Sequence, residues 1–355
     1  MASVFKTFLN NDIVSTRTLL HEAIPITGSI LSGTYSEENI KNYTHGIFQS
    51  VYDFPIASSS ANHLFDITFG YSPQSGLSSS ANNQNAKKIN IYNQLAQVLA
   101  GHDATGSILE FDQDGNILAG GNKLREVVFL NFSRLLYKDE IKKGSFSLVL
   151  GGQTDYNDAF SALLTITDAG AQNDFRVNSP AGEYGILTAS AGSAFSGSGL
   201  SGSLGLIFYQ AGIAVLTASA FLGTGTIGGV LEQNAIMDTG SNTILDFMTG
   251  STISGSSNAL RHRIQNLSFN NTTELNSTFH FCRINNNDFN YSSNPTYVSG
   301  SKIRVKNNTL DAPVTYITSV GLYSADNELL AVAKLSEPLK KDPTNELNLR
   351  VRLDY

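Results

Sequence analysis

The sequence of 355 residues has no tryptophan, one cysteine and few charged side chains, which make up 15% of the chain. The single thiol, Cys282, can form neither an internal disulfide nor a zinc site, and this usage is typical of a chain made in a reducing cytoplasm. The formal net charge of −7 argues against nucleic acid as a partner, because a polyanion binds to net or clustered lysine and arginine. Four basic clusters are short and isolated, and we interpret them as solvated turns: Lys87-Lys88, Lys142-Lys143, Arg261-His262-Arg263 and Lys340-Lys341.

Sequence motifs of catalysis and metal binding are also missing. The six histidines show no H-E-x-x-H or H-x-H spacing, and no serine stands in a G-x-S-x-G elbow. His102 and Asp103 are adjacent in an expected turn, so a hydrogen-bonded turn is favoured over a catalytic dyad. Cys282 alternates with aromatic residues in an expected strand, which favours a buried structural thiol over a nucleophile. We therefore predict no enzyme activity, no catalytic or metal-binding residue and no cofactor.

Three short motifs resemble ligand-binding loops but lack the surrounding pattern that such loops need. G-x-G-x-x-G occurs over residues 197–202 and 223–228, and Asp246 stands about where a ribose-binding acid would follow the second. No βαβ pattern surrounds either one, so chance matches in a chain with 31 glycines are favoured. Residues 112–116 resemble the start of a calcium loop, but glycine is fourth and Lys123 stands at position twelve. A tight Asp-Gly turn is favoured over a loose calcium site.

The hydrophobic pattern predicts a mainly β chain with a few helices, in an α+β arrangement of antiparallel, sandwich-like modules. Residues 1–75 are predicted as a helical attachment segment. Residues 76–260 are predicted as a β-rich central domain, and residues 261–355 as an antiparallel C-terminal β module.

Capping residues and periodicity place the predicted helices. Asn11 or Asp12 can begin a helix that Pro25 ends, and Ser36 can begin a second. A third helix is predicted over residues 91–99, with Gly101 as its C-cap. The strands are predicted over these ranges: 51–56, 65–69, 127–136, 146–150, 160–166, 185–189 and 206–216, with a further strand pair over 267–281.

Residues 184–231 contain no Asp, Glu, Lys or Arg. Residues 204–222 within them are long enough to cross a membrane, but Gln210 and Thr217 interrupt them and no basic flank accompanies them. A buried strand pair or a contact between subunits is therefore favoured over a membrane span. Three apolar residues of this stretch are candidate assembly residues: Leu206, Phe208 and Val215.

The last nine residues alternate between apolar and polar side chains, which predicts a half-buried strand that is tied into a sheet. Arg350 and Arg352 are predicted on its outer face. Residues 314–335 precede it and are predicted as strand, polar turn and strand. The inner face supplies three further candidate assembly residues: Leu349, Val351 and Leu353.

Residues 317–342 read ITSVGLYSADNELLAVAKLSEPLKKD, and this stretch resembles a pattern in structural proteins of tailed bacteriophages, seen in tail-fibre, collar, tail and baseplate proteins. Residues 63–76, HLFDITFGYSPQSG, are similar to an opening in baseplate proteins of contractile-tailed phages. The resemblance implies a virion part without saying which, and it brings no catalytic residues. The matching positions are Ile317, residues 320–323, Asp326, residues 329–335, Lys340 and Lys341.

Together these observations predict a non-enzymatic structural component of a tailed-phage particle, from its tail, baseplate or fibre-attachment region. The chain would be made in the host cytoplasm and located in the virion. It would assemble with other virion proteins as a homo-oligomer around a symmetry axis, without nucleic acid or a membrane span. The open alternatives are a capsid or neck component, a glycan depolymerase, which needs two facing carboxylates, and a receptor- or glycan-binding adhesin with Tyr291, Tyr297 and Tyr323 as candidate platforms.

Overall fold

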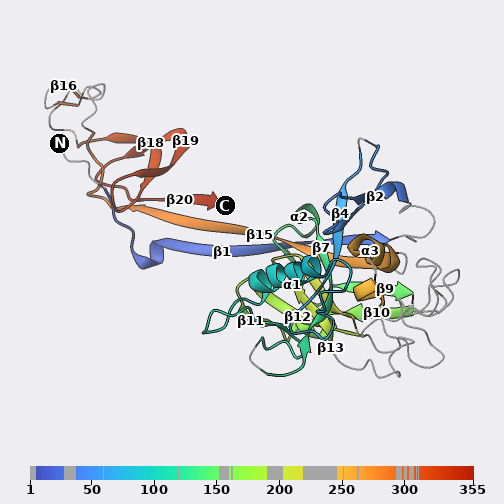
Figure 1. The fold of residues 1–355 in the computed structure, drawn as a ribbon. Coiled ribbons are helices and arrows are strands. Elements are labelled where there is room, and N and C mark those ends of the chain that lie inside the picture. Colours follow the sequence, from blue (N-terminus) through green and yellow to red (C-terminus); the bar gives the residue numbers. More distant parts are fainter. Residues whose placement is uncertain are drawn as a thin grey trace. The chain divides into compact units, whose positions relative to one another are not determined.

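The computed structural model describes residues 5–27, 37–58, 60–117, 120–151, 160, 163–189, 203–218, 246–250, 252–261, 264–292, 298–299, 302–303, 308, 310 and 312–355. The chain is mainly β with a few helices, which confirms the predicted fold class. It divides into two compact units (Figure 1). Unit 1 consists of Met1–Leu19 and Glu274–Tyr355, and unit 2 of Leu20–Thr273.

This division differs from the three predicted segments, because tertiary contacts join the start of the chain to its end. In unit 1 the Lys6 ammonium pairs with Asp288, and Arg283 Nε lies 2.6 Å from Asp12 Oδ1. The boundary between the units falls inside two long strands, β1 (Ile13–Thr27) and β15 (Ile264–Ile284). No signal in the local sequence marks such a boundary.

Unit 2 is built on an antiparallel sheet in the order β15-β9-β10-β12-β13-β14-β7-β4-β3-β2. β8 pairs with β15, β11 pairs with β12, and β5 and β6 form a separate hairpin. The strands are β2 (Ile40–Asn42), β3 (Gln49–Tyr52), β4 (His63–Tyr71), β5 (Phe111–Asp112), β6 (Lys123–Leu124), β7 (Glu126–Phe132), β8 (Glu140–Ile141), β9 (Ser147–Gly151), β10 (Leu163–Thr167), β11 (Arg176–Ser179), β12 (Gly182–Ala189), β13 (Ser203–Phe208) and β14 (Ile213–Thr217).

The central strands of this sheet are covered on both faces. All five residues of β14 are buried, and so are most of those in β4 and β7, which explains why their sequences read as continuous apolar runs. Helices α1 (Asn85–Leu99) and α3 (Ile253–Arg261) pack against β4 (Figure 1). The third α-helix of the described residues is α2 (Arg134–Tyr137), and short 3-10 or π segments cover Asn10–Asp12, Glu37–Asn39, Ala169–Gln172 and Asp246–Gly250.

Helix α1 ends where the sequence predicts. The Ala100 and Gly101 N–H groups both donate to the carbonyl of Ala96, and Gly101 has a φ of +87°. A residue in this left-handed region is strained unless it is glycine, so Gly101 can end the helix at little cost.

In unit 1 the end of β15 pairs antiparallel with β20 (Leu347–Asp354), with Ser277 opposite Asp354 and Ile284 opposite Leu347. β18 (Thr315–Tyr323) and β19 (Leu329–Lys341) form a hairpin that is a two-stranded sheet of its own. This hairpin confirms the predicted strand, turn and strand. β16 (Val298–Ser299) and β17 (Lys302–Ile303) form a short second hairpin.

The prediction of a helical N-terminal segment is wrong. Residues 13–27 form the strand β1, which lies next to β15 in the sheet. The residues are rich in β-branched side chains, and pairing with a long strand outweighs their apparent helical spacing. The second predicted helix is replaced by a 3-10 turn and β2, and the strand pair predicted over 267–281 is the single strand β15. Among the described residues, no helix has both the length and the apolar character needed to cross a membrane.

Gly70 lies where β4 meets α1, and we expect Gly70→Ala to destabilise unit 2. A Cβ atom there would stand 2.8 Å from the Lys88 carbonyl oxygen and 2.9 Å from the Tyr92 nitrogen, so the backbone would have to move. Such overpacking costs about 1–3 kcal/mol, measurable by urea unfolding. Gly76→Ala is the matched control, since a Cβ at Gly76 meets nothing within 4 Å. Equal stability of the two variants would contradict the close contact between strand and helix.

Candidate assembly surface and polar networks

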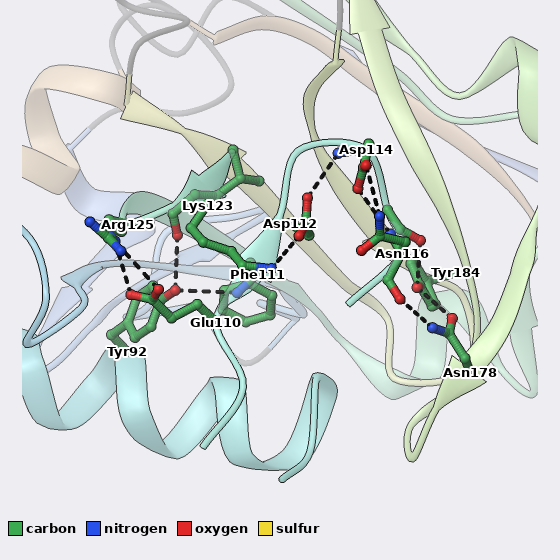
Figure 2. A network of polar contacts seen from close by, with 12 residues as sticks. Tyr92, Glu110, Phe111, Asp112, Asp114, Asn116, Lys123, Arg125, Asn178 and Tyr184 are labelled. Carbon is green, nitrogen blue, oxygen red and sulfur yellow. Dashed lines mark hydrogen bonds and ion pairs between the residues drawn. The ribbon is translucent and has the colours of Figure 1, made fainter. Parts of the chain in front are cut away.

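A network of polar contacts surrounds the turn after β5 (Figure 2). Asp112 is fully buried, and the Lys123 ammonium pairs with its carboxylate. The Asp114 N–H donates to Asp112 Oδ1 at 3.3 Å, and Asn116 Nδ2 donates to Asp114 Oδ2 at 2.7 Å. Gly115 has a φ of +69°, so this is the tight Asp-Gly turn that the sequence predicts.

The pKa values of the two aspartates of this turn are shifted in opposite directions. Burial alone would raise the pKa of Asp112, but the Lys123 ammonium and hydrogen bonds to the Asp114 residue hold that pKa below its ordinary value. The hydrogen bond to Asp112 raises the pKa of Asp114. Diverging carboxyl pKa values are typical of acid–base pairs. Here, however, Asp112 is enclosed and bound to Lys123, so its carboxylate cannot contact a substrate in this arrangement.

A tyrosine anchors the other side of this turn. Tyr184 on β12 is fully buried, and its hydroxyl donates to the Gly115 carbonyl at 2.7 Å and contacts Asn178 Oδ1 at 2.6 Å. Asn178 Nδ2 donates to the Asn116 carbonyl at 2.5 Å (Figure 2). Burial raises the pKa of Tyr184 to about 12, so the hydroxyl remains protonated at neutral pH and can donate. The network therefore holds the turn against the sheet.

A second buried carboxylate, Asp168, organises the loop before β9. Its oxygens accept the Gly144 and Phe146 N–H groups, both at 2.8 Å, and the Tyr209 hydroxyl at 2.9 Å. Burial raises the pKa of Asp168 above its ordinary value despite these donors. Because backbone donors occupy the carboxylate, its role in this geometry is to fix the loop.

The interpretation of the basic clusters as solvated turns is wrong for their buried members, Lys88, Arg261 and Lys341. Lys87 and Lys340 are exposed, and His262 and Arg263 lie outside the described residues. Lys88 is fully buried and donates to the Met248 carbonyl at 2.6 Å, and burial lowers its pKa to about 8. Lys341 is fully buried and donates to Asn290 Oδ1 at 2.7 Å. Arg261 is fully buried in α3. In the remaining cluster, Lys143 is largely enclosed, at 3.3 Å from Glu140 and 2.5 Å from Glu183. Lys88, Lys143 and Lys341 thus bind acceptors inside the protein rather than water.

The predicted turn at His102 and Asp103 is confirmed. Asp103 Oδ1 accepts the Thr105 hydroxyl at 2.7 Å and the Thr105 and Ser107 N–H groups at 2.8 Å each, and these hydrogen bonds lower the pKa of Asp103. Within the part of the chain that the structure describes, no three His, Cys, Asp or Glu side chains gather into a metal-binding group. Both G-x-G-x-x-G matches and Tyr297 lie outside the described residues.

Three of the six candidate assembly residues belong to the core of unit 2. Leu206, Phe208 and Val215 are fully buried within β13 and β14, and Phe208 stacks on Tyr184 with ring centroids 5.1 Å apart. These side chains are covered by their own unit and present no surface to a partner. The uncharged sequence reflects strands that are buried on both faces, which composition alone does not distinguish from a subunit contact.

The other three candidate assembly residues lie on the face of β20 that the sequence predicts for them. Leu349, Val351 and Leu353 are half-buried, while the intervening Arg350 and Arg352 are exposed. The apolar residues face the β15 residues Cys282, His280 and Thr278, in that order. The guanidinium groups of Arg350 and Arg352 lie 5.3 Å and 5.7 Å from the ring centroid of Phe279, so the charged face also covers an aromatic side chain.

Among the described residues, unit 1 has almost no hydrophobic core, which the strand pattern did not predict. The main core cluster draws on residues 40–269 only, and the buried apolar side chains described in unit 1 are Ile284, Val314 and Leu322. Strand alternation indicated half-burial but could not show how little of the apolar face the described residues cover. The exposed large apolar residues of this unit are Phe5, Leu9, Ile13, Val14, Leu19, Leu275, Phe289, Tyr291, Leu310, Tyr316, Tyr323, Leu329, Leu330, Val332 and Tyr355.

We expect Lys123→Met to lower the free energy of unfolding of unit 2 by about 3–5 kcal/mol at neutral pH, because the variant leaves the Asp112 carboxylate buried without its cation. Adding Asp112→Asn should recover much of that loss. Arg125→Met is the control, since Arg125 and Glu110 form a pair that is partly exposed and contributes up to about 1 kcal/mol. Urea unfolding measures all four chains. A double variant no more stable than Lys123→Met would contradict the structural role of the pair.

We expect Val351→Asp to lower the melting temperature, because it places a carboxylate on the half-buried face of β20. Asn348→Asp places the same group on the exposed face and should change the free energy of unfolding by less than about 0.5 kcal/mol. Thermal melting followed by circular dichroism compares the two. If Asn348→Asp is the more damaging, the faces of the strand are reversed and the register is wrong by one residue.

Comparison with protein-family models, curated proteins and solved structures finds no match to this chain. The likeness of residues 317–342 to phage structural proteins stays a prediction.

Proposed function

We propose that this chain is a non-enzymatic structural component of a tailed-phage particle, and that it acts by assembling with other copies and other virion proteins. The observation that carries the proposal is the contrast between the two units. Unit 2 encloses a large core, whereas unit 1 exposes most of its large apolar side chains among the described residues. Exposed apolar patches of this kind mark interaction surfaces.

The energetics favour an assembly role for unit 1. A domain of about 100 residues usually buries well over half of the surface that its unfolded chain exposes. Unit 1 instead relies on strand pairing and on ion pairs such as Arg17–Glu274 and Lys6–Asp288. Exposed ion pairs contribute only about 0–1 kcal/mol each to the free energy of unfolding. Burial of the exposed apolar side chains of unit 1 against a partner would therefore add most of the stability that the unit lacks alone.

The stretch that resembles phage structural proteins coincides with part of this surface. Residues 317–342 cover nearly all of the β18–β19 hairpin, where Tyr323, Leu329 and Leu330 are exposed by 46%, 53% and 68%. A hairpin with exposed apolar residues suits contacts between subunits. We propose a place in the tail, baseplate or fibre-attachment region, with synthesis in the host cytoplasm.

The direct test is the composition of virus particles. We expect quantitative mass spectrometry of purified particles, from the virus that encodes this chain, to detect it at a fixed number of copies relative to the other virion proteins. The chain should withstand a high-salt wash, because apolar contacts are not screened by salt. Its absence from purified particles, with its presence in infected cells, would overturn the proposal. Binding of the free chain to a glycan array would favour the adhesin alternative.

A further inference from the structure

Asp66 on β4 is a half-buried carboxylate of unit 2 that pairs with no lysine or arginine among the described residues. Its side chain is 18% exposed. Oδ1 accepts the Ser50 hydroxyl at 2.5 Å and lies 2.8 Å from His63 Nε2. Oδ2 has no hydrogen-bond partner in the part of the chain that the structure describes. One oxygen of this carboxylate is therefore still able to accept a donor from outside.

Other enclosed carboxylates of unit 2 have a cation of their own. Asp112 pairs with Lys123, and Glu140 lies 3.3 Å from Lys143. Enclosing a carboxylate costs free energy unless a positive charge or enough donors compensate it. The charge on Asp66 is compensated only at Oδ1, so a cation brought to Oδ2 would be bound favourably.

The strands beside Asp66 bring no such cation to it. Asp66 lies opposite Ser50 on β3 and Asn131 on β7, and Lys41 on β2 lies opposite Ser50. Neighbouring strands are about 4.8 Å apart, so the Lys41 backbone is about 10 Å from that of Asp66. The Lys41 ammonium lies 5.0 Å from the centroid of the Tyr43 ring instead. The lysine of this row thus contacts an aromatic ring and not the carboxylate.

Two aromatic side chains stand next to Asp66 on the same face of the sheet. Tyr52 and His63 are a cross-strand pair, both half-buried, and their ring centroids are 5.5 Å apart. Burial raises the pKa of Tyr52, and so do a hydrogen bond with Tyr43 and the charge of Asp66, so the Tyr52 hydroxyl stays protonated at neutral pH. Because the face of an aromatic ring attracts cations, the rings and the carboxylate favour the same kind of ligand.

We propose that Asp66, with the rings of Tyr52 and His63, binds an arginine side chain of a different protein of the particle. A guanidinium group is flat, carries five N–H donors and stacks on a ring while it donates to a carboxylate, whereas a lysine ammonium acts as a point charge. Tyrosine and arginine are enriched among the residues that contribute most to protein interfaces. The inference rests on the proposed assembly function and names one contact through which unit 2 takes part in it.

A different protein is favoured over a second copy, because most of the arginines that the structure describes already pair with a carboxylate of this chain. They are Arg17, Arg125, Arg134, Arg176, Arg283 and Arg352. A neutral sugar would also stack on the rings, but it would leave the charge of Asp66 without a counter-ion. The charge therefore favours arginine over a sugar.

A small arginine compound tests the site on the full chain. N-acetyl-L-argininamide, added to protein with isotope-labelled histidines at neutral pH, should shift the His63 NMR signal to saturation. The signal is identified by its loss in His63→Gln. N-acetyl-L-citrullinamide has nearly the same shape without the charge and should not shift the signal. Asp66→Asn keeps the side-chain shape and an acceptor for Ser50, and it should weaken the binding by about tenfold or more. Asp174→Asn is the control, since it removes an exposed carboxylate elsewhere in unit 2.

A photocrosslink tests the contact in the particle. With p-benzoylphenylalanine in place of Tyr52, irradiation of purified particles should join this position to a peptide of another virion protein, and that peptide should contain arginine. Adding Asp66→Asn should reduce the yield of the crosslink several-fold, because the arginine is then held less tightly.

The outcomes separate this inference from the proposed function. The absence of a saturable shift, equal binding of the arginine and citrulline compounds, or no crosslinked peptide with arginine from another protein would overturn the arginine site. A glycan-array signal that Asp66→Asn abolishes would overturn it as well, and would assign the same residues to a sugar. The proposed function depends on whether purified particles contain the chain, and that result does not depend on what binds to Asp66.

Discussion

Backbone hydrogen bonding along β15 supports both units of this chain. In unit 2, its first residues pair with β9 and β8, so that Leu267 lies opposite Leu148 and Asn271 opposite Ile141. In unit 1, its last residues pair with β20 from Ser277 to Ile284. A strand of 21 residues is long for a soluble protein, where most have about 3–10. Its length follows from having sheet partners in both units.

The two units differ in how fully they bury their apolar side chains. Unit 2 covers its central strands with helices α1 and α3, and several of its charged side chains are buried. Lys88, Lys123 and Asp168 each meet a specific partner inside it. Because an unpaired buried charge would cost several kcal/mol, loss of any of these partners would destabilise the core.

Unit 1 has the opposite balance. β20 places polar or charged residues on one face and apolar ones on the other, whereas β19 exposes Leu330 and Val332 beside Lys334. Among the described residues, nothing covers these apolar side chains fully. The Arg350 and Arg352 guanidinium groups partly cover Phe279, but they shield only this one aromatic side chain. Other copies of the chain and other virion proteins would provide the missing burial under our proposed function.

The sequence by itself determined the mainly β class, the helix ending at Gly101, the Asp-Gly turn after Asp112 and the two faces of β20. These features depend on periodicity and turn chemistry, which are local. Only the tertiary structure decided that residues 13–27 form a strand, because pairing with β15 overrides their local preference. It also decided that Leu206, Phe208 and Val215 are core and that Lys88 is buried. Burial depends on which distant segments cover a residue, and a single sequence does not show that.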